Sequence, residues 1–150
     1  MIVKLERIEV QSHKDMEMID ITADVDRVVS ESGLQDGTVM AMTAHTSAGV
    51  LVTEGIECLE RDILAHLERL APKDPPEGTY GYWHNRYLDY DGRLGFNAGD
   101  HLKSILGGVN CMFPVENGKV VRGSRQRIYF VEYDGPLART VFIQVFGEGR

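Results

Sequence analysis

The chain has 150 residues, of which 43% are apolar, and a formal net charge of −7. This length fits one compact domain, expected to span residues 1–150, and the apolar fraction is too high for a disordered chain. Lys and Arg form no basic stripe, so we expect no nucleic-acid partner. No apolar run approaches the roughly 18 residues of a membrane helix, and residues 1–10 carry charges, unlike a signal peptide. We therefore expect no membrane partner and a cytoplasmic location.

The residues up to position 53 predict four strands around one helix. Strands are expected where apolar and polar residues alternate or apolar residues run together, at residues 3–10, 18–22, 39–44 and 50–53. The polar segment 11–15 predicts a turn that joins the first two strands as a hairpin. Thr22 or Asp24 can then cap a helix that ends at Gly33.

Residues 56–96 predict one helix and one long loop. Apolar residues recur at three- and four-residue steps over 56–70, which indicates an amphipathic helix stopped by Pro72. Residues 72–96 combine several Pro and Gly residues with many aromatic side chains. A loop of this length is uncommon in a compact domain, so we expect an ordered loop that covers another part of the molecule.

The last third of the chain predicts a short helix followed by strands. Asn97 is the expected N-cap of this helix, with Asp100 in an approximate capping box and Gly107-Gly108 at its end. Strands are expected at residues 109–115, 119–121, 128–133 and 140–146. The turn residues 117–118 and 134–136 predict that these strands form two hairpins. Together the elements predict an α+β domain with a mixed, largely antiparallel sheet and helices packed on one side.

Three histidines lie where functional sites are commonly assembled on a scaffold. His45 ends a predicted strand, His84 lies in the long loop and His101 lies at a helix start. Taken singly, each more often has a structural role. If they converge, three imidazoles with an open fourth position predict a divalent metal site, with zinc as the first choice. The helix start, with Lys103 nearby, could instead bind phosphate through its free N–H groups.

Two carboxylates and one hydroxyl are further candidates. Strand alternation places Glu132 on the face of Ile128 and Phe130, where a buried carboxylate needs a partner or a task. Glu54 follows a strand and could orient a ligand histidine, and a solvated carboxylate is the alternative for both residues. Ser47 lacks the defined base and sharp turn of a nucleophile, so we expect its hydroxyl to bind backbone or substrate.

Five short motifs follow one another across nearly the whole chain. They are His45-Thr46-Ser47-Ala48-Gly49 with Thr53-Glu54, Tyr82-Trp83-His84, Asn97-Ala98-Gly99-Asp100-His101-Leu102-Lys103, Gly123-Ser124-Arg125-Gln126 and Glu132-Tyr133-Asp134-Gly135-Pro136. In this order they resemble the signature of the YjbQ-like family, also described as secondary thiamine-phosphate synthase-type proteins. The resemblance implies an α+β fold, a homotrimer, a metal site that includes the three histidines, and a weak thiamine-phosphate synthase activity in some members.

The chain departs from the family pattern at three positions. Thr53 stands where the family has an asparagine beside Glu54, Asp100 stands where it has an alanine before His101, and Arg125 replaces a tryptophan. The three histidines stay in place. Metal or acid–base chemistry is therefore better supported than any particular substrate.

We therefore predict an enzyme that uses a divalent metal, held by His45, His84 and His101, to act on an anionic, phosphorylated small molecule. Thiamine-phosphate synthesis is the reaction that the resemblance implies. The predicted catalytic residues are Glu54 and Glu132, and the predicted substrate-binding residues are Ser47, Lys103, Ser124, Gln126 and Arg139. The alternative is a non-catalytic protein, either a metal-dependent small-molecule binder or a trimeric scaffold.

Overall fold

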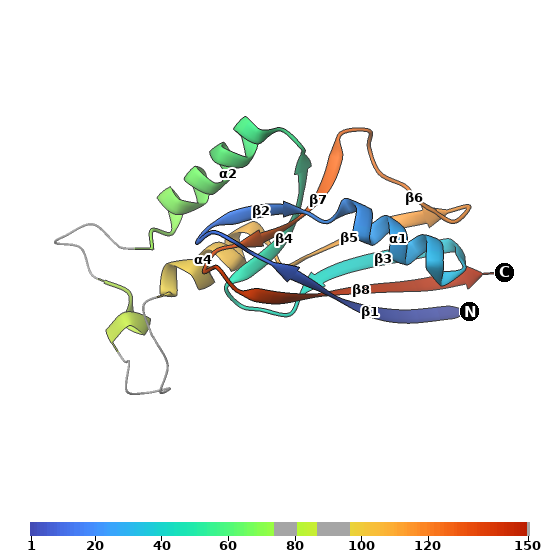
Figure 1. The fold of residues 1–150 in the computed structure, drawn as a ribbon, viewed down its shortest axis with the longest axis horizontal. Coiled ribbons are helices and arrows are strands. Elements are labelled where there is room, and N and C mark those ends of the chain that lie inside the picture. The colour runs from blue at the N-terminus through green and yellow to red at the C-terminus, as the bar shows by residue number, and fades with distance from the viewer. Residues whose placement is uncertain (74–80, 87–96, 150) are drawn as a thin grey trace.

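The computed structural model describes residues 1–73, 81–86 and 97–149, and the strands among them form two antiparallel sheets (Figure 1). The strands are β1 (Ile2–Gln11), β2 (Glu17–Asp20), β3 (Leu34–Thr43), β4 (Ala48–Glu54), β5 (Asn110–Glu116), β6 (Lys119–Val120), β7 (Gln126–Glu132) and β8 (Ala138–Gly149). The larger sheet has the order β1-β8-β3-β5-β6 and the smaller one β2-β7-β4. The helices are α1 (Thr22–Ser32), α2 (Glu57–Leu70), α4 (Ala98–Gly107) and the 3-10 turn η1 (Trp83–Arg86). The predicted α+β class is confirmed.

The main core lies between the two sheets. The larger sheet contributes alternate apolar residues such as Ile143 and Val145, and the smaller sheet contributes Val50 and Phe130. Helix α1 fills the same layer beside the smaller sheet, with Val25, Val28 and Val29 buried. This arrangement is a sandwich in which one partner sheet is extended by a helix.

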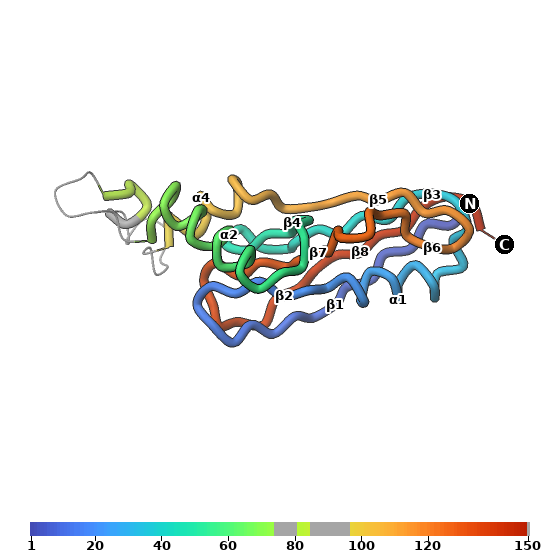
Figure 2. The backbone as a smooth tube through the Cα atoms, turned by 90° about the horizontal axis from the view of Figure 1, so that it is seen from above, coloured from blue at the N-terminus to red at the C-terminus, as the bar shows by residue number. Residues whose placement is uncertain are grey.

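The other face of the smaller sheet is covered by α2. Tyr129, Val131 and Tyr133 point away from the main core and pack against Leu67 of α2 in a second apolar cluster. Helix α4 contacts both β4 and α2 at the end of this layer. Because α1 and α2 both lie on the smaller sheet's side of the five-stranded sheet, the helices pack on one side, as predicted (Figure 2).

Two of the three predicted hairpins are wrong, because their strands separate into different sheets. β1 pairs with β8 along its whole length, while β2 pairs with β7. Turn residues predict where the chain reverses direction, but not whether the strands on either side of the turn pair with each other. At a corner between two sheets, the chain passes from one sheet to the other. The two corners lie side by side, since the Gly135 N–H donates to the Asp15 carbonyl over 2.9 Å. The third hairpin, β5–β6 around Asn117-Gly118, is confirmed.

The sequence predicts the positions of these helix ends better than the hydrogen bonds that cap them. Gly33 ends α1 in the left-handed conformation, with φ of 81°, as expected of a C-terminal glycine. Asn97 does precede α4, but its side chain makes no capping hydrogen bond. Of the long loop, residues 74–80 and 87–96 lie outside the described part, so its predicted role as a cover stays a prediction.

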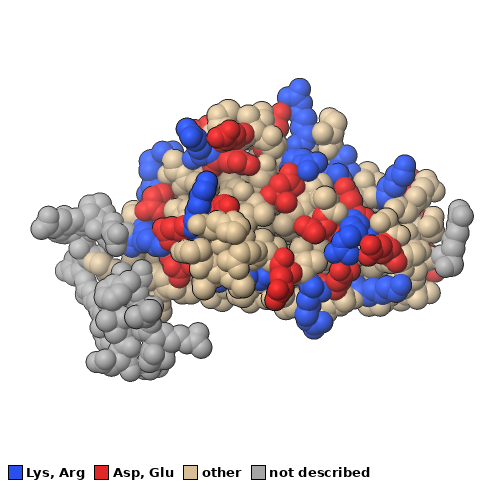
Figure 3. All heavy atoms as spheres, viewed as in Figure 1, with Lys and Arg blue, Asp and Glu red and all other residues tan. Residues whose placement is uncertain are grey.

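No helix within the described residues is long and apolar enough to cross a membrane. On the face drawn in Figure 3, Lys and Arg side chains alternate with Asp and Glu, in keeping with the mixed charges of the sequence. Both termini lie at the end of the molecule opposite η1 (Figure 1).

Candidate functional site

His45 follows the end of β3, where the chain leaves the larger sheet. Its Nε2 atom accepts a hydrogen bond of 2.8 Å from the backbone N–H of Thr140, on the neighbouring β8. A nitrogen that accepts from an N–H is unprotonated, so the neutral ring carries its proton on Nδ1. Burial lowers the pKa of His45, and the nearby charge of Arg139 lowers it further. This imidazole is therefore held neutral and offers an N–H donor.

His84 and His101 lie edge to face, with their ring centroids 5.3 Å apart. Nδ1 of His101 is 2.8 Å from the carbonyl oxygen of Thr46, and Nε2 of His84 is 3.0 Å from the amide oxygen of Asn97. Both partner atoms are acceptors, so each of these ring nitrogens carries a proton. The lone pair of the neutral ring then lies on Nε2 of His101 and on Nδ1 of His84.

Glu132 and Arg139 form a buried ion pair beside the histidines. The Nε atom of Arg139 donates to Oε1 of Glu132 over 2.8 Å, and its Nη2 atom lies 2.5 Å from Oε2. The Ser12 hydroxyl and the Asp134 N–H also donate to the carboxylate. The Nη2 atom of Arg139 reaches the Ser47 hydroxyl as well, at 3.0 Å. This carboxylate is saturated with donors, which suits it to holding Arg139 in place.

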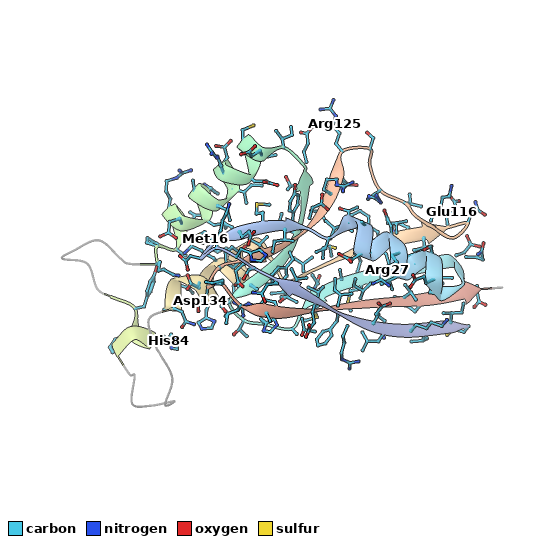
Figure 4. The ribbon with its side chains drawn as sticks, viewed as in Figure 1. Met16, Arg27, His84, Glu116, Arg125 and Asp134 are labelled. Carbon is cyan, nitrogen blue, oxygen red and sulfur yellow. The ribbon has the colours of Figure 1, made fainter. Side chains whose placement is uncertain are left out.

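These side chains surround one cleft of about 550 Å³. Its walls come from the ends of β3 and β8, from η1 and from the start of α4. The lining residues are Ala44, His45, Thr46, Ser47, His84, Asn97, His101, Asp134, Leu137 and Arg139. His84 and Asp134 lie near one another at this end of the molecule in Figure 4. The structure thus brings the three predicted histidines to one cleft, together with Ser47 and Arg139.

The three histidines do not fit a three-ligand metal site as they are placed. His84 and His101 have the arrangement of metal ligands, since the far nitrogen of each ring is held by an oxygen acceptor. His45 differs, because the Thr140 N–H occupies its Nε2 lone pair and its Nδ1 carries a proton. Among the residues that the structure describes, no three His, Cys, Asp or Glu side chains are grouped to hold a metal.

A larger pocket, of about 620 Å³, lies between α1 and the β5–β6 hairpin. Three of its charged residues are already paired, since Arg122 binds both carboxylate oxygens of Asp26 at 3.0 Å and Arg27 binds Glu6 at 2.9 Å. It contains none of the five histidines. The histidine cleft, although smaller, is the better candidate for a functional site.

One family model, described as UPF0047 protein YjbQ-like, matches residues 6–148. The chain belongs to this YjbQ-like family. A UPF0047 protein of Archaeoglobus fulgidus is 38% identical over 137 residues, which cover 91% of this chain and 97% of the relative. The UPF0047 protein YugU of Bacillus subtilis is 31% identical over 144 residues, which cover 95% of this chain and 99% of the relative.

Solved structures of YjbQ-like proteins share the fold along nearly the whole chain. A YbjQ-like protein of unknown function from Sulfolobus solfataricus superposes with a TM-score of 0.85 at 31% identity, covering 97% of this chain and 98% of that one. A hypothetical protein from Aeropyrum pernix gives a TM-score of 0.84 at 30% identity, covering 97% and 99%. The fold is therefore that of the family.

Several residues of the YjbQ-like motifs lie far from the histidine cleft. Glu54 is at the other end of β4, paired in register with Gln126. Because β4 runs over seven residues, this end is about 20 Å from Ala48. Glu54 binds Arg125 at 2.8 Å, and Gln126 accepts from the N–H of Gly123. Figure 4 shows Arg125 at the top of the molecule, well away from His84. Glu54, Ser124 and Gln126 are not among the residues that line the cleft.

Lys103, a residue of α4, has a buried side chain and lines neither the histidine cleft nor the pocket beside it. Its Nζ atom lies 2.5 Å from Oε2 of Glu68 and 3.5 Å from Oδ1 of Asp100. Asp100 also lies 3.3 Å from Nζ of Lys73. Burial raises the pKa of Asp100 to about 6, although the two lysines oppose that shift. This position gives Lys103 a structural contact and no access to a substrate.

Sequence reasoning missed three residues that hold the cleft together. The sequence predicts a capping role for Asn97, but its side chain bridges His84 and Asp134, donating from Nδ2 to Oδ2 of Asp134 over 3.0 Å. Asp134 falls within a YjbQ-like motif, which was a signal for it. Ser12 lies in a polar turn, 120 positions from its partner Glu132, and no local pattern points to that contact.

Proposed function

We propose that the chain is an enzyme that binds an anionic, phosphorylated small molecule in the histidine cleft and transfers protons through its imidazoles. One observation carries the proposal: His45, His84 and His101 come from three separate elements and line one cleft with Arg139. Since Glu132 balances the charge of Arg139, hydrogen bonds rather than net charge would hold the anion.

The orientation of the rings supports acid–base chemistry. The cleft contains one imidazole that offers an N–H, His45, and two that offer a lone pair, His84 and His101. A lone pair of His84 or His101 can take a proton from one atom of a substrate, and the imidazolium so formed can return it to another atom, while the neutral His45 ring donates a hydrogen bond. Such groups contribute when they lie within hydrogen-bond reach of the reacting atoms, which a cleft of about 550 Å³ permits.

Zinc remains a prediction, and no step of the proposed chemistry depends on it. The hydrogen bonds of His84 and His101 favour metal binding, while that of His45 opposes it. Elemental analysis of purified protein, before and after dialysis against zinc, tests the prediction. One equivalent of zinc that is lost in His101→Gln but kept in the surface variant His66→Gln would support the prediction. The absence of bound zinc from the wild-type protein, before and after dialysis, would exclude it.

Thiamine-phosphate synthesis is the reaction that we propose first, on the family resemblance alone. The test is product formation by purified wild-type protein from the pyrimidine diphosphate and the thiazole phosphate. We expect His101→Gln to abolish turnover, and His66→Gln, on an exposed position of α2, to retain it. Equal rates in the wild type and His101→Gln would end the assignment of this reaction to the cleft.

The alternative is a non-catalytic binder or a trimeric scaffold, and one surface favours assembly. Strand register places apolar residues together on the outer face of the larger sheet: Val3, Leu5, Met112 and Phe146, which are 60%, 44%, 58% and 40% exposed. An open apolar face of this kind commonly marks an interface. We propose that it serves the homotrimer of a cytoplasmic protein. A trimer mass by light scattering that falls to a monomer in Met112→Glu would support this.

A further inference from the structure

The histidine cleft continues into a second pocket with different walls. This pocket, of about 440 Å³, shares Ala44, His45, Thr46 and His101 with the polar cleft. Its remaining lining residues are Met42, Thr43, Ser104, Ile105, Val109 and Phe142. Four of these six are apolar, whereas the remaining walls of the polar cleft are mainly Ser47, His84, Asn97, Asp134 and Arg139. The two pockets meet at His45 and His101.

The apolar wall is built by the outer face of the larger sheet and by α4. Met42 on β3 and Phe142 on β8 are register partners, so their side chains share one face of that sheet. Ile105 follows His101 by four residues on α4 and therefore lies on the same helix face. This side chain is 75% exposed, so it contributes little to the protein's own core.

The polar side chains of the second pocket are already occupied. The Ser104 hydroxyl donates to the Ala48 carbonyl over 2.7 Å, and Oγ1 of Thr43 accepts from the His45 N–H. The histidines present one ring nitrogen each to these pockets, since the other is held by Thr140 or Thr46. Beyond those two ring nitrogens, a charged group entering here would lose its hydration without replacement, whereas an apolar group would gain from burial.

We propose that the two pockets form one bipartite site for a ligand with an anionic group and a small uncharged ring or comparable apolar group. The apolar pocket takes the ring, and Ile105 and Phe142 are its specificity-determining residues. The inference rests on the proposed function for the anionic half only. His45 and His101 lie where the two parts of such a ligand join, which places their ring nitrogens against the linking atoms.

Calorimetric titrations with inorganic phosphate and with phenyl phosphate test the two halves separately. We expect phenyl phosphate to bind at least about tenfold more tightly, because its ring is buried while the phosphate group is common to both probes. Ile105→Ser should remove most of that advantage and leave the affinity for inorganic phosphate unchanged. Leu106→Ser is the matched control, since Leu106 is the next residue of α4, is 55% exposed and lines neither pocket.

Each outcome separates this inference from the proposed function. Equal affinities for the two probes would overturn the apolar pocket and leave the anionic site standing, while failure of both probes to bind would remove the anionic site on which it rests. Equal losses in Ile105→Ser and Leu106→Ser would mean non-specific binding to α4 and would overturn the inference. A changed mass of Ile105→Ser in light scattering would also overturn it, because Ile105 would then be an assembly contact.

Discussion

The backbone N–H of Thr140 donates to Nε2 of His45 over 2.8 Å, and this bond fixes which nitrogen of the ring carries a proton. It ties the end of β3 to the start of β8, two strands that are neighbours in the larger sheet. The same bond distinguishes His45 from His84 and His101, whose restrained nitrogens face oxygen acceptors. The histidine cleft therefore holds three imidazoles in two different roles.

We predict that His45 makes stability depend on pH. Burial and Arg139 lower its pKa in the folded protein, so between that value and the unfolded value of about 6.5 the unfolded chain binds more protons. The contribution of His45 to stability is then complete above pH of about 6.5 and is lost as the pH falls through the lower folded pKa. NMR titration of the His45 ring and urea unfolding from pH 5 to 8 measure both effects.

The variant His45→Gln isolates this contribution. Its amide oxygen can still accept from the Thr140 N–H but does not titrate, so part of the loss of stability in acid should disappear. His66→Gln, which changes an exposed histidine of α2, should leave the pH profile as it is in the wild type. A measured pKa for folded His45 above 6.5 would contradict the prediction.

The buried pair of Glu132 and Arg139 should be among the most sensitive points of the fold. In Arg139→Met the Glu132 carboxylate remains buried without its cation, which should cost about 3–5 kcal/mol in the free energy of unfolding. The double variant Glu132→Gln with Arg139→Met should recover part of that loss. The control is Arg125→Met: Arg125 pairs with Glu54 but is 80% exposed, so we expect a cost of at most about 1 kcal/mol. Similar losses in the two single variants would contradict the prediction.

Local periodicity was sufficient to orient β7 correctly. Alternation predicted that Glu132 shares one face with Ile128 and Phe130. These two apolar residues lie in the main core, while Tyr129, Val131 and Tyr133 lie in the second cluster, which confirms the alternation. Local periodicity could not predict which strands β1 and β2 pair with. Their turn specified a reversal, but the sheet that each strand joins depends on distant partners, β8 for one and β7 for the other.

The candidate site was predicted in part for similar reasons. Residue type and position directed attention to His45, His84 and His101, which line one cleft. Glu54 follows the His45 motif closely in the sequence, but the extended strand β4 carries it about 20 Å from Ala48, away from the cleft. Lys103 follows His101 by two residues, about 200° around a helix, and so faces the interior.

Asp100 should act on stability in the opposite direction to His45. Burial raises its pKa to about 6 from 3.8, outweighing the nearby Lys73 and Lys103, so the folded protein binds more protons between these values. The contribution of Asp100 is present below pH 3.8 and is lost as the pH rises through about 6. Urea unfolding of the wild type and of Asp100→Asn between pH 4 and 7.5 should show that the variant loses less stability as the pH rises. Parallel curves would show that Asp100 has an ordinary pKa.

We predict, last, that Asn97 fixes the ring of His84 rather than the start of α4. Its Oδ1 atom accepts from Nε2 of His84 while its Nδ2 atom is held by Asp134, so the amide cannot turn without losing both bonds. In Asn97→Ala the Nε2–H form of His84 should lose its preference, which nitrogen-15 chemical shifts of the imidazole report directly. Because Asn97 makes no capping hydrogen bond, the thermal stability of the variant should stay close to that of Asn110→Ala, a control at the exposed first residue of β5. A large loss of stability with an unchanged His84 spectrum would instead assign Asn97 to the helix.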